Sequence, residues 1–416
     1  LREPEALTLM FFFFPLSWLL AHVGRLVEIA KVLRQRGHEV VFAGADPAHP
    51  RSKLFMAANS GFELLRVKEP DHPYAWDRFV RHGWLITAWD LVFRHHIWAP
   101  LEEILRDQVR LIEREQPDMV VGDGTVSVST AAHITGIPAA GIMNAYVTRF
   151  VARDSMFLPL IRAWDCLTLA RIRKRVYRTY RRKPVNAIRL LKSIPLISPD
   201  LPELYTIPKR YANWRAVGPI LSEPPVPLPD WYDELSDGRP NVYITMGSTG
   251  IFDSFLRRTF DVLAKAPFRF LVTTGGQVSE ETLSMTPPNF RVTTYAPGAE
   301  LLKRCQALIF HGGNGTMYQG LAAGVPMIAL PSHLEQDICA DICVRHGFGI
   351  KLRPRRVRGE DVLQAIHEVI KNPAYRQAAE RLAPAVRTAN GAQAAADIIE
   401  RTARKGIPAG EALDLS

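Results

Sequence analysis

Cysteine is scarce in this chain. The 416 residues include only Cys166, Cys305, Cys339 and Cys343, and no two of them form a CxxC pair. This usage excludes a disulfide framework and suggests no zinc site, because both need more thiols at closer spacing. The composition therefore indicates a reducing compartment, and we expect a cytoplasmic protein.

The sequence also lacks an apolar run long enough to span a bilayer. Its most apolar segment, residues 9–20, contains four consecutive phenylalanines, but Pro15 interrupts it. A basic leader and a small-x-small cleavage site, which a signal peptide needs, are both missing. We therefore interpret this segment as a buried first strand, apolar on both faces as in a parallel sheet.

Strand-like and helix-like segments alternate along the chain, and no repeat of solenoid length occurs. After the first strand, residues 24–36 carry apolar side chains at helical spacing and end at Gly37. Further strands are expected at residues 39–43, 118–121, 138–143, 241–246, 269–273, 290–294 and 307–310. This order is typical of α/β proteins with parallel sheets, and it occurs as two series.

A proline-rich segment separates the two series. Residues 218–229 contain five prolines in twelve residues and no apolar periodicity, as expected of a semi-rigid linker. A chain of 416 residues also exceeds the size that a single core usually supports. We therefore predict an N-terminal domain at 1–220, a C-terminal domain at 221–400 and a polar tail at 401–416. Ligands of two such doubly wound domains are expected in the cleft between them, at the carboxyl ends of the strands.

The most informative motif follows the strand expected at 307–310. Residues 311–316 read His-Gly-Gly-Asn-Gly-Thr and open a helix-like segment. Closely spaced glycines at a helix start leave backbone N–H groups directed at an anion, and the helix dipole adds positive potential there. His311 and Thr316 supply further donors, so the motif predicts a phosphate site. A glycine-rich turn that only packs a strand against a helix is the alternative.

The motif and its context resemble the sugar-nucleotide signature of the family 1 glycosyltransferases, which have the GT-B fold and include natural-product enzymes. The resemblance covers the glycine-rich loop, its helix, the strand-like run at 324–331 and the polar pair after it. It implies two Rossmann-like domains, with a nucleoside-diphosphate sugar bound by the C-terminal one. The implied donor-binding residues are Ser248, Tyr295, Ala296, His311, Gly313, Asn314, Gly315, Thr316, Gln319, Glu335 and Gln336.

Two departures from the family pattern concern the donor. Gln319 stands where uridine-using members often carry a glutamate for the two ribose hydroxyls. Gly298 replaces a frequent glutamine directly after residues 295–297, the segment that holds the nucleobase in the family. We expect UDP, with dTDP as the alternative. By the same resemblance, Glu335 and Gln336 read the hydroxyls of a hexose.

The resemblance also assigns the chemistry. His22, directly after the first strand, stands where the family has the general base that takes the proton of the acceptor hydroxyl, a role that suits a neutral imidazole. Asp123 is the expected partner that orients the ring, whereas Asp118 precedes its strand and is expected at the opposite edge of the sheet. A packing histidine and a helix-capping aspartate are the alternatives.

No Asp-x-Asp motif occurs in the sequence, and His311 with the helix terminus already provides positive potential for a diphosphate. We therefore expect an inverting displacement that uses no metal ion and no cofactor, with the nucleotide sugar as co-substrate. The alternatives are a nucleotide-sugar epimerase or hydrolase on the same fold and a non-catalytic sugar- or lipid-binding protein.

Two further segments concern the acceptor. Residues 162–192 carry eleven Lys and Arg against one acid, which suits either a basic amphipathic helix on an anionic membrane or a solvated helix face. No nucleic-acid-binding motif accompanies them. Tryptophans are concentrated at residues 76–98, where the GT-B fold builds its acceptor wall, and such aromatic surfaces suit a flat or lipophilic small molecule. The candidate acceptor residues are Trp76, Trp84, Trp89 and Tyr146.

Overall fold

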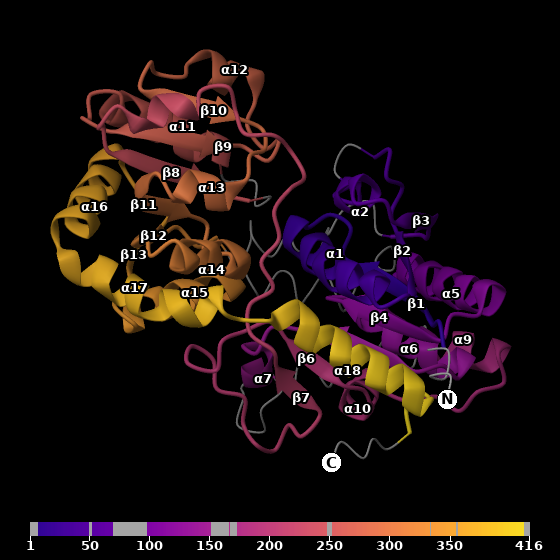
Figure 1. The fold of residues 1–416 in the computed structure, drawn as a ribbon. Helices are drawn as coiled ribbons and strands as arrows, with labels where there is room; N and C mark the ends of the chain where they lie inside the picture. Colours follow the sequence, from indigo (N-terminus) through magenta and orange to yellow (C-terminus); the bar gives the residue numbers. More distant parts are fainter. Residues whose placement is uncertain are drawn as a thin grey trace, which may run out of the picture. The chain divides into compact units, whose positions relative to one another are not determined.

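The computed structural model describes residues 7–49, 52–69, 98–150, 166, 173–247, 252–332, 334–354 and 357–411. The chain forms two compact units (Figure 1). Unit 1 comprises residues 1–220 and 390–416, and unit 2 comprises residues 221–389. Each unit contains one sheet in which the paired strands run parallel.

In the described part of unit 1, the sheet has seven strands in the order β3-β2-β1-β4-β5-β6-β7. The strands are β1 (Met10–Pro15), β2 (Glu39–Gly44), β3 (Glu63–Arg66), β4 (Met119–Asp123), β5 (Ala139–Ile142), β6 (Leu196–Ser198) and β7 (Trp214–Ala216). The helices are α1 (Leu20–Gln35), α2 (Phe55–Asn59), α5 (Trp98–Glu115), α6 (Val126–Thr135), α7 (Val147–Phe150), α9 (Lys174–Thr179), α10 (Ala187–Ser193) and α18 (Gly391–Lys405).

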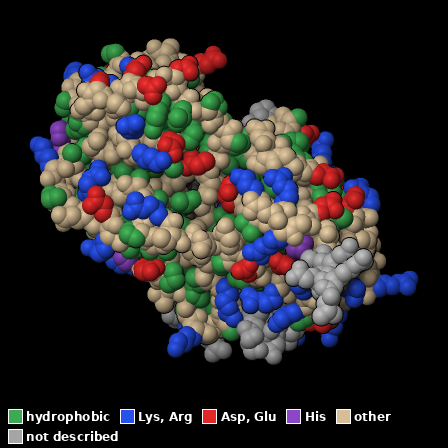
Figure 2. All heavy atoms as spheres, in the orientation of Figure 1, with side chains coloured by type: hydrophobic (Ala, Val, Ile, Leu, Met, Phe, Trp, Pro, Cys, Tyr) green, Lys and Arg blue, Asp and Glu red, His purple; other side chains and the backbone are tan. Residues whose placement is uncertain are grey.

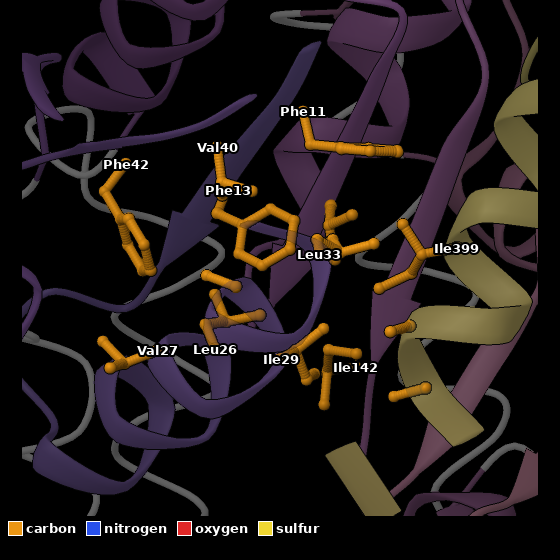
Figure 3. Packing of buried hydrophobic residues seen from close by; sticks show 14 of the residues in the cluster. Phe11, Phe13, Leu26, Val27, Ile29, Leu33, Val40, Phe42, Ile142 and Ile399 are labelled. Carbon is orange, nitrogen blue, oxygen red and sulfur yellow. The ribbon is translucent and has the colours of Figure 1, made fainter. Parts of the chain in front are cut away.

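Strand β1 supplies side chains to the cores on both faces of this sheet, because successive side chains of a strand point to opposite faces. Phe11 and Phe13 pack on the face covered by α1 and α18, with Leu33 and Ile399 (Figure 3). Phe12 and Phe14 belong to the core on the other face. The interpretation of the apolar run as a doubly buried strand is confirmed.

The last helix, α18, packs on α1 within unit 1. Ala395 and Ile399 lie in the same core as Phe11, and Arg36 at the end of α1 forms ion pairs with Asp397 and Glu400. The structure differs here from the expected boundaries, which gave residues up to 400 to the C-terminal domain and left 401–416 as a tail. The apolar side of this helix is mostly alanine, so its pattern does not indicate which sheet it covers.

In the described part of unit 2, the sheet has six strands in the order β10-β9-β8-β11-β12-β13. The strands are β8 (Asn241–Thr245), β9 (Arg269–Thr273), β10 (Phe290–Thr293), β11 (Cys305–Phe310), β12 (Met327–Ala329) and β13 (Gly349–Lys351). The helices are η3 (Asp233–Ser236, a 3₁₀ turn), α11 (Phe252–Leu263), α12 (Glu280–Ser284), α13 (Gly298–Leu302), α14 (Asn314–Ala322), α15 (Leu334–Arg345), α16 (Gly359–Lys371) and α17 (Pro373–Arg387).

Two local expectations are corrected by the structure. Helix α1 begins at Leu20, four residues before the predicted start, so His22 lies in its first turn. The basic segment 162–192, over its described part, is not one continuous helix but two short ones, α9 and α10. Arg181 between them adopts φ +52°, which a continuous right-handed helix does not allow. Figure 2 shows Lys and Arg side chains gathered on the surface around α10.

Candidate active site

Each sheet has a point where the strand order reverses: between β1 and β4 in unit 1, and between β8 and β11 in unit 2. Ligands of open α/β sheets bind at the carboxyl ends of the strands beside this point. The predicted catalytic residues follow β1 and end β4, and the predicted phosphate loop follows β11. The fold therefore brings each predicted set of residues to the reversal point of its own sheet.

His22 and Asp123 are in direct contact. Nδ1 of His22 lies 2.6 Å from Oδ1 of Asp123, which is the last residue of β4 and pairs in register with Pro15 of β1. The Asp123 side chain is fully buried, whereas that of His22 is 19% exposed. The buried carboxylate therefore binds the Nδ1 side of the ring. Nε2 is the ring nitrogen that is left to contact a substrate. Asp118 lies at the other end of β4, where it accepts a hydrogen bond from Met10 N at 2.7 Å.

Sequence reasoning missed a third member of this site, Arg25. Its guanidinium donates Nε and Nη2 to the two carboxylate oxygens of Asp123, and it donates Nη1 to Oδ1 of Asn144 at 2.8 Å. Arg25 lies three residues after His22 on α1, so the two side chains share one face of the helix. The spacing places Arg25 on the same helix face as His22, but no local pattern indicates its contact with Asp123.

Arg25 and His22 keep Asp123 ionised. Complete burial alone would raise the pKa of Asp123, but the charge of Arg25 and then that of His22, with their hydrogen bonds, outweigh burial and hold this pKa below its usual value. Because Arg25 is always protonated, the three side chains together carry no net charge while His22 is neutral. They carry one positive charge once His22 has taken a proton.

Gly124 makes room for the ring of His22. It adopts φ +71°, and a Cβ at this position would lie 2.9 Å from Cε1 of His22. Glycine adopts this conformation without strain, and its missing side chain lets the backbone after Asp123 pass close to the imidazole. A side chain at this position would push the ring away from the carboxylate.

In unit 2, His311 lies between two glycine-rich turns at the reversal point. A Cβ at Gly247, after β8, would lie 2.9 Å from Cε1 of His311, and a Cβ at Gly313 would clash with Nε2 of the same ring. Gly312 adopts φ +86° and packs against the backbone carbonyl of Gln336. Glycine at these positions therefore holds the imidazole close to the backbone of the predicted phosphate loop.

Helix α14 begins within this loop. Its N-cap is Gly313, which offers no side-chain acceptor, and the bond from Met317 N to Gly313 O is the first of the helix. The backbone N–H groups of Gly315 and Thr316 precede that bond and are not used within the helix. The loop therefore combines N–H donors, the positive end of the helix dipole and an imidazole, which is the arrangement that binds phosphate oxygens.

Four other predicted donor residues lie after β10 and at the start of α15. Tyr295 is partly buried after β10 and its hydroxyl donates to Gly275 O at 3.4 Å, while Ala296 is buried. Glu335 is partly buried at the start of α15. Gln336 is buried, and its Oε1 accepts hydrogen bonds from the backbone N and the hydroxyl of Ser332, both at 2.9 Å. Gln336 therefore braces its own loop through Oε1.

Several predicted residues lie outside the described residues, namely Ser248, Trp76, Trp84 and Trp89. Tyr146 is described and partly buried, two residues after Asn144, which contacts Arg25. Among the residues that the structure describes, no group of three or more His, Cys, Asp or Glu side chains gathers as metal ligands would. In the same residues, no helix is both long and apolar enough to cross a membrane.

The chain is similar in sequence to glycosyltransferases. Residues 258–400 match the family described as erythromycin biosynthesis protein CIII-like, C-terminal domain. The PGL/p-HBAD biosynthesis rhamnosyltransferase of Mycobacterium bovis (strain BCG / Pasteur 1173P2) is 31% identical over 314 residues, which cover 70% of this chain and 69% of that protein. The 4'-demethylrebeccamycin synthase of Lentzea aerocolonigenes is 27% identical over 418 residues, covering 91% and 96% of the two chains.

The fold is also that of known glycosyltransferases. The glycosyltransferase SnogD from Streptomyces nogalater superposes with a TM-score of 0.72 at 20% identity, covering 95% of this chain and all of SnogD. SnogD has the GT-B fold, so the expected fold class is confirmed. The sequence relatives, the matched family and the paired parallel-sheet units agree: this chain is a glycosyltransferase and belongs to the natural-product glycosyltransferases of the GT-B fold.

Proposed function

We propose that this glycosyltransferase transfers a hexose from a nucleoside-diphosphate sugar to a hydroxyl group, with inversion and without a metal ion. The observation that carries the proposal is the 2.6 Å contact between His22 Nδ1 and Asp123 Oδ1 at the reversal point of the unit 1 sheet. Asp123 accepts a hydrogen bond from Nδ1–H of His22 and thereby fixes the tautomer whose Nε2 is a base.

In the proposed reaction, Nε2 of His22 takes the proton of the acceptor hydroxyl as its oxygen attacks the anomeric carbon. The bond between that carbon and the diphosphate oxygen breaks, and the nucleoside diphosphate leaves with the electron pair. A single displacement inverts the anomeric configuration. The N–H groups at the start of α14 and the ring of His311 stabilise the negative charge of the leaving group.

For the donor we propose UDP, with dTDP as the alternative. Glu335 and Gln336 lie next to the phosphate loop, since Gly312 packs against the carbonyl of Gln336, and this position supports contact with the sugar hydroxyls. Because one relative is named a rhamnosyltransferase, the donor sugars to be tested include a 6-deoxyhexose. The proposed acceptor is a flat or lipophilic small molecule, bound in part by Tyr146.

Membrane contact is a second proposal, and it rests on the exposed basic side chains of residues 174–192, which we call the basic surface. The exposed residues are Lys174, Arg175, Arg178, Arg181, Arg182, Lys183, Arg189 and Lys192. Lys and Arg near an anionic bilayer attract it with about 1 kcal/mol each. This surface would hold the enzyme beside a lipophilic acceptor at the membrane, in addition to its transferase activity.

The test is a panel of UDP- and dTDP-linked hexoses, each incubated with and without a phenolic acceptor and followed by NMR of the anomeric proton. We expect transfer only with acceptor present, and a product of inverted configuration. A retained configuration would overturn the single displacement. Conversion of the donor sugar in the absence of acceptor would instead identify an epimerase or a hydrolase.

A further inference from the structure

A carboxylate from the proline-rich linker reaches the nucleotide side of unit 2. Oε1 of Glu223 accepts hydrogen bonds from Ala299 N at 3.0 Å and from Nε2 of Gln319 at 3.0 Å. Oε2 is buried and accepts no hydrogen bond within the described residues. Burial raises the pKa of Glu223, although the backbone N–H donors act against this. The Glu223 side chain therefore binds the start of α13, and it also binds Gln319 of α14.

The same contacts fix the orientation of the Gln319 amide. Besides Glu223 Oε1, the backbone carbonyl of Ser222 lies 3.2 Å from the amide nitrogen of Gln319. Both neighbours are acceptors, so only the NH₂ end of the amide can face them. The amide nitrogen of Gln319 donates its two N–H groups to Ser222 and Glu223 of the linker. Its Oε1 therefore points away from the linker.

The amide oxygen lies beside the segment assigned to the nucleobase. A Cβ built on Gly298 would be 3.5 Å from Oε1 of Gln319, and Gly298 directly follows residues 295–297. Oε1 accepts no hydrogen bond among the residues that the structure describes, and it is not one of the buried atoms without a partner. Gln319 also lies three residues after Thr316 on α14, on the same side of the helix as the phosphate loop.

We propose that Glu223 is a positioning residue that fixes the Gln319 amide so that its oxygen serves as a neutral acceptor for the pentose hydroxyls of the donor. This inference rests on the proposed function, because it requires a nucleoside diphosphate at α14. A hydrogen bond to a neutral amide oxygen contributes less binding free energy than a hydrogen bond to a carboxylate. Loss of the 2′-hydroxyl therefore weakens binding at this site only slightly. The site therefore accepts ribose and 2′-deoxyribose with similar affinity.

The experiment is calorimetric titration of the full chain with UDP and with 2′-deoxy-UDP. For the unmodified protein we expect affinities within about 3-fold of each other, which corresponds to one weak neutral hydrogen bond. Glu223→Ala frees the amide, and we expect both nucleotides to bind about 3- to 10-fold more weakly while kcat is unchanged. Glu223→Gln should restore binding, because its amide oxygen can accept in place of Oε1.

Reversing the two side chains gives a sharper test. Gln319→Glu alone places two carboxylates in contact, so we expect it to weaken UDP binding. Combining it with Glu223→Gln restores a donor–acceptor pair and presents a carboxylate to the pentose. We expect the double variant to prefer UDP over 2′-deoxy-UDP by about 10-fold or more. Glu300→Gln is the matched control, since it removes a neighbouring acid that does not contact Gln319, and it should leave both affinities unchanged.

Three results would overturn this inference. They are a preference above 10-fold for UDP in the unmodified protein, unchanged binding by Glu223→Ala with an unchanged melting temperature, and failure of the double variant to regain UDP binding. If the unmodified protein binds neither UDP nor dTDP, the proposed function itself fails. If it binds them and transfers sugar while the Glu223 variants behave like the parent, only the role of Glu223 fails.

Discussion

Arg25 neutralises the same buried carboxylate, Asp123, that holds the ring of His22. The proposed catalytic pair therefore belongs to a group of three side chains, one of which, Arg25, is a permanent cation. Asp123 orients His22 and, in the same geometry, depends on Arg25 for its own ionisation. We therefore expect changes at Asp123 to affect both the proposed activity and the stability of unit 1.

Replacing His22 by Ala removes the proposed base. We expect kcat for transfer to fall by about 10²- to 10⁴-fold, the usual contribution of general base catalysis, while UDP binding is unchanged. Asp123→Asn should reduce kcat as well, because an amide can hold the wrong tautomer. Steady-state kinetics with calorimetric UDP titration checks both, and transfer at the parent rate in His22→Ala would eliminate this pair as the catalytic machinery.

Arg25→Met leaves Asp123 buried without its permanent cation. We expect a loss of about 3 to 5 kcal/mol in the free energy of unfolding, as for other broken buried ion pairs. The double variant Arg25→Met/Asp123→Asn should recover much of this stability but not the activity, because it removes the unpaired charge together with its orienting role. Urea denaturation of the single and double variants measures this. Equal destabilisation of both would show that packing and not charge is responsible.

Gly313→Ala tests whether the missing side chain at this position is needed to hold the ring of His311 in place. The residue adopts φ −74°, which alanine allows, so the effect comes from the clash of Cβ with the imidazole. We expect UDP to bind about 10-fold more weakly, as in His311→Ala, since one charge-assisted hydrogen bond is lost. The two changes together should be no worse than either alone. Additive losses in calorimetry would mean that the glycine acts independently of the ring.

Glu69 predicts a pH dependence of stability. Burial raises its pKa from 4.5 to about 7, against hydrogen bonds from Ser17 and Ala45. Between these values the unfolded chain binds fewer protons than the folded one, so the stabilisation present below pH 4.5 is lost as the pH rises to about 7. The loss is about 3 kcal/mol.

Glu69→Gln should remove this loss and make unit 1 more stable than the parent at pH 8. Denaturation curves at pH 5 and pH 8 measure the difference. Glu63→Gln, an exposed residue of β3, is the matched control and should keep the parent's pH dependence. A Glu69→Gln variant with that same dependence would contradict the assignment.

The basic surface predicts binding to anionic vesicles. We expect cosedimentation with phosphatidylserine vesicles at low salt and its loss at high salt, because screening shortens the range of the attraction. The test variant replaces the exposed residues Lys174, Arg178, Arg181 and Lys183 by Gln. The control variant replaces an equal number of exposed basic residues of unit 2, namely Lys265, Lys371, Arg381 and Arg387. No binding by the parent at low salt would leave the surface as solvated helices.

The sequence predicted the parallel sheets because buried strands of this class are short apolar runs bounded by turn residues. The strand predicted at 269–273 has the bounds of β9, and the pairing of His22 with Asp123 follows from the rule that carboxyl ends of parallel strands share an edge. The same rule excludes Asp118 as the partner of His22, because Asp118 precedes β4 and lies at the opposite edge of the sheet.

Arg25, Glu223 and the position of α18 were not predicted. Each depends on contacts between segments far apart in the sequence, about which local pattern carries little information. Glu223 lies in a proline-rich stretch that has no periodicity, and its partner Gln319 is on α14. Helix α18 is amphipathic, but an alanine face fits many cores.

The return of α18 to unit 1 makes unit 2 an insertion within unit 1. During synthesis, residues 221–389 leave the ribosome as an unbroken segment and can complete their own core. The core of unit 1 is incomplete until Ile399 and its neighbours have been synthesised, because they pack with Phe11 and Phe13. We therefore expect unit 1 to emerge first and to finish folding after unit 2.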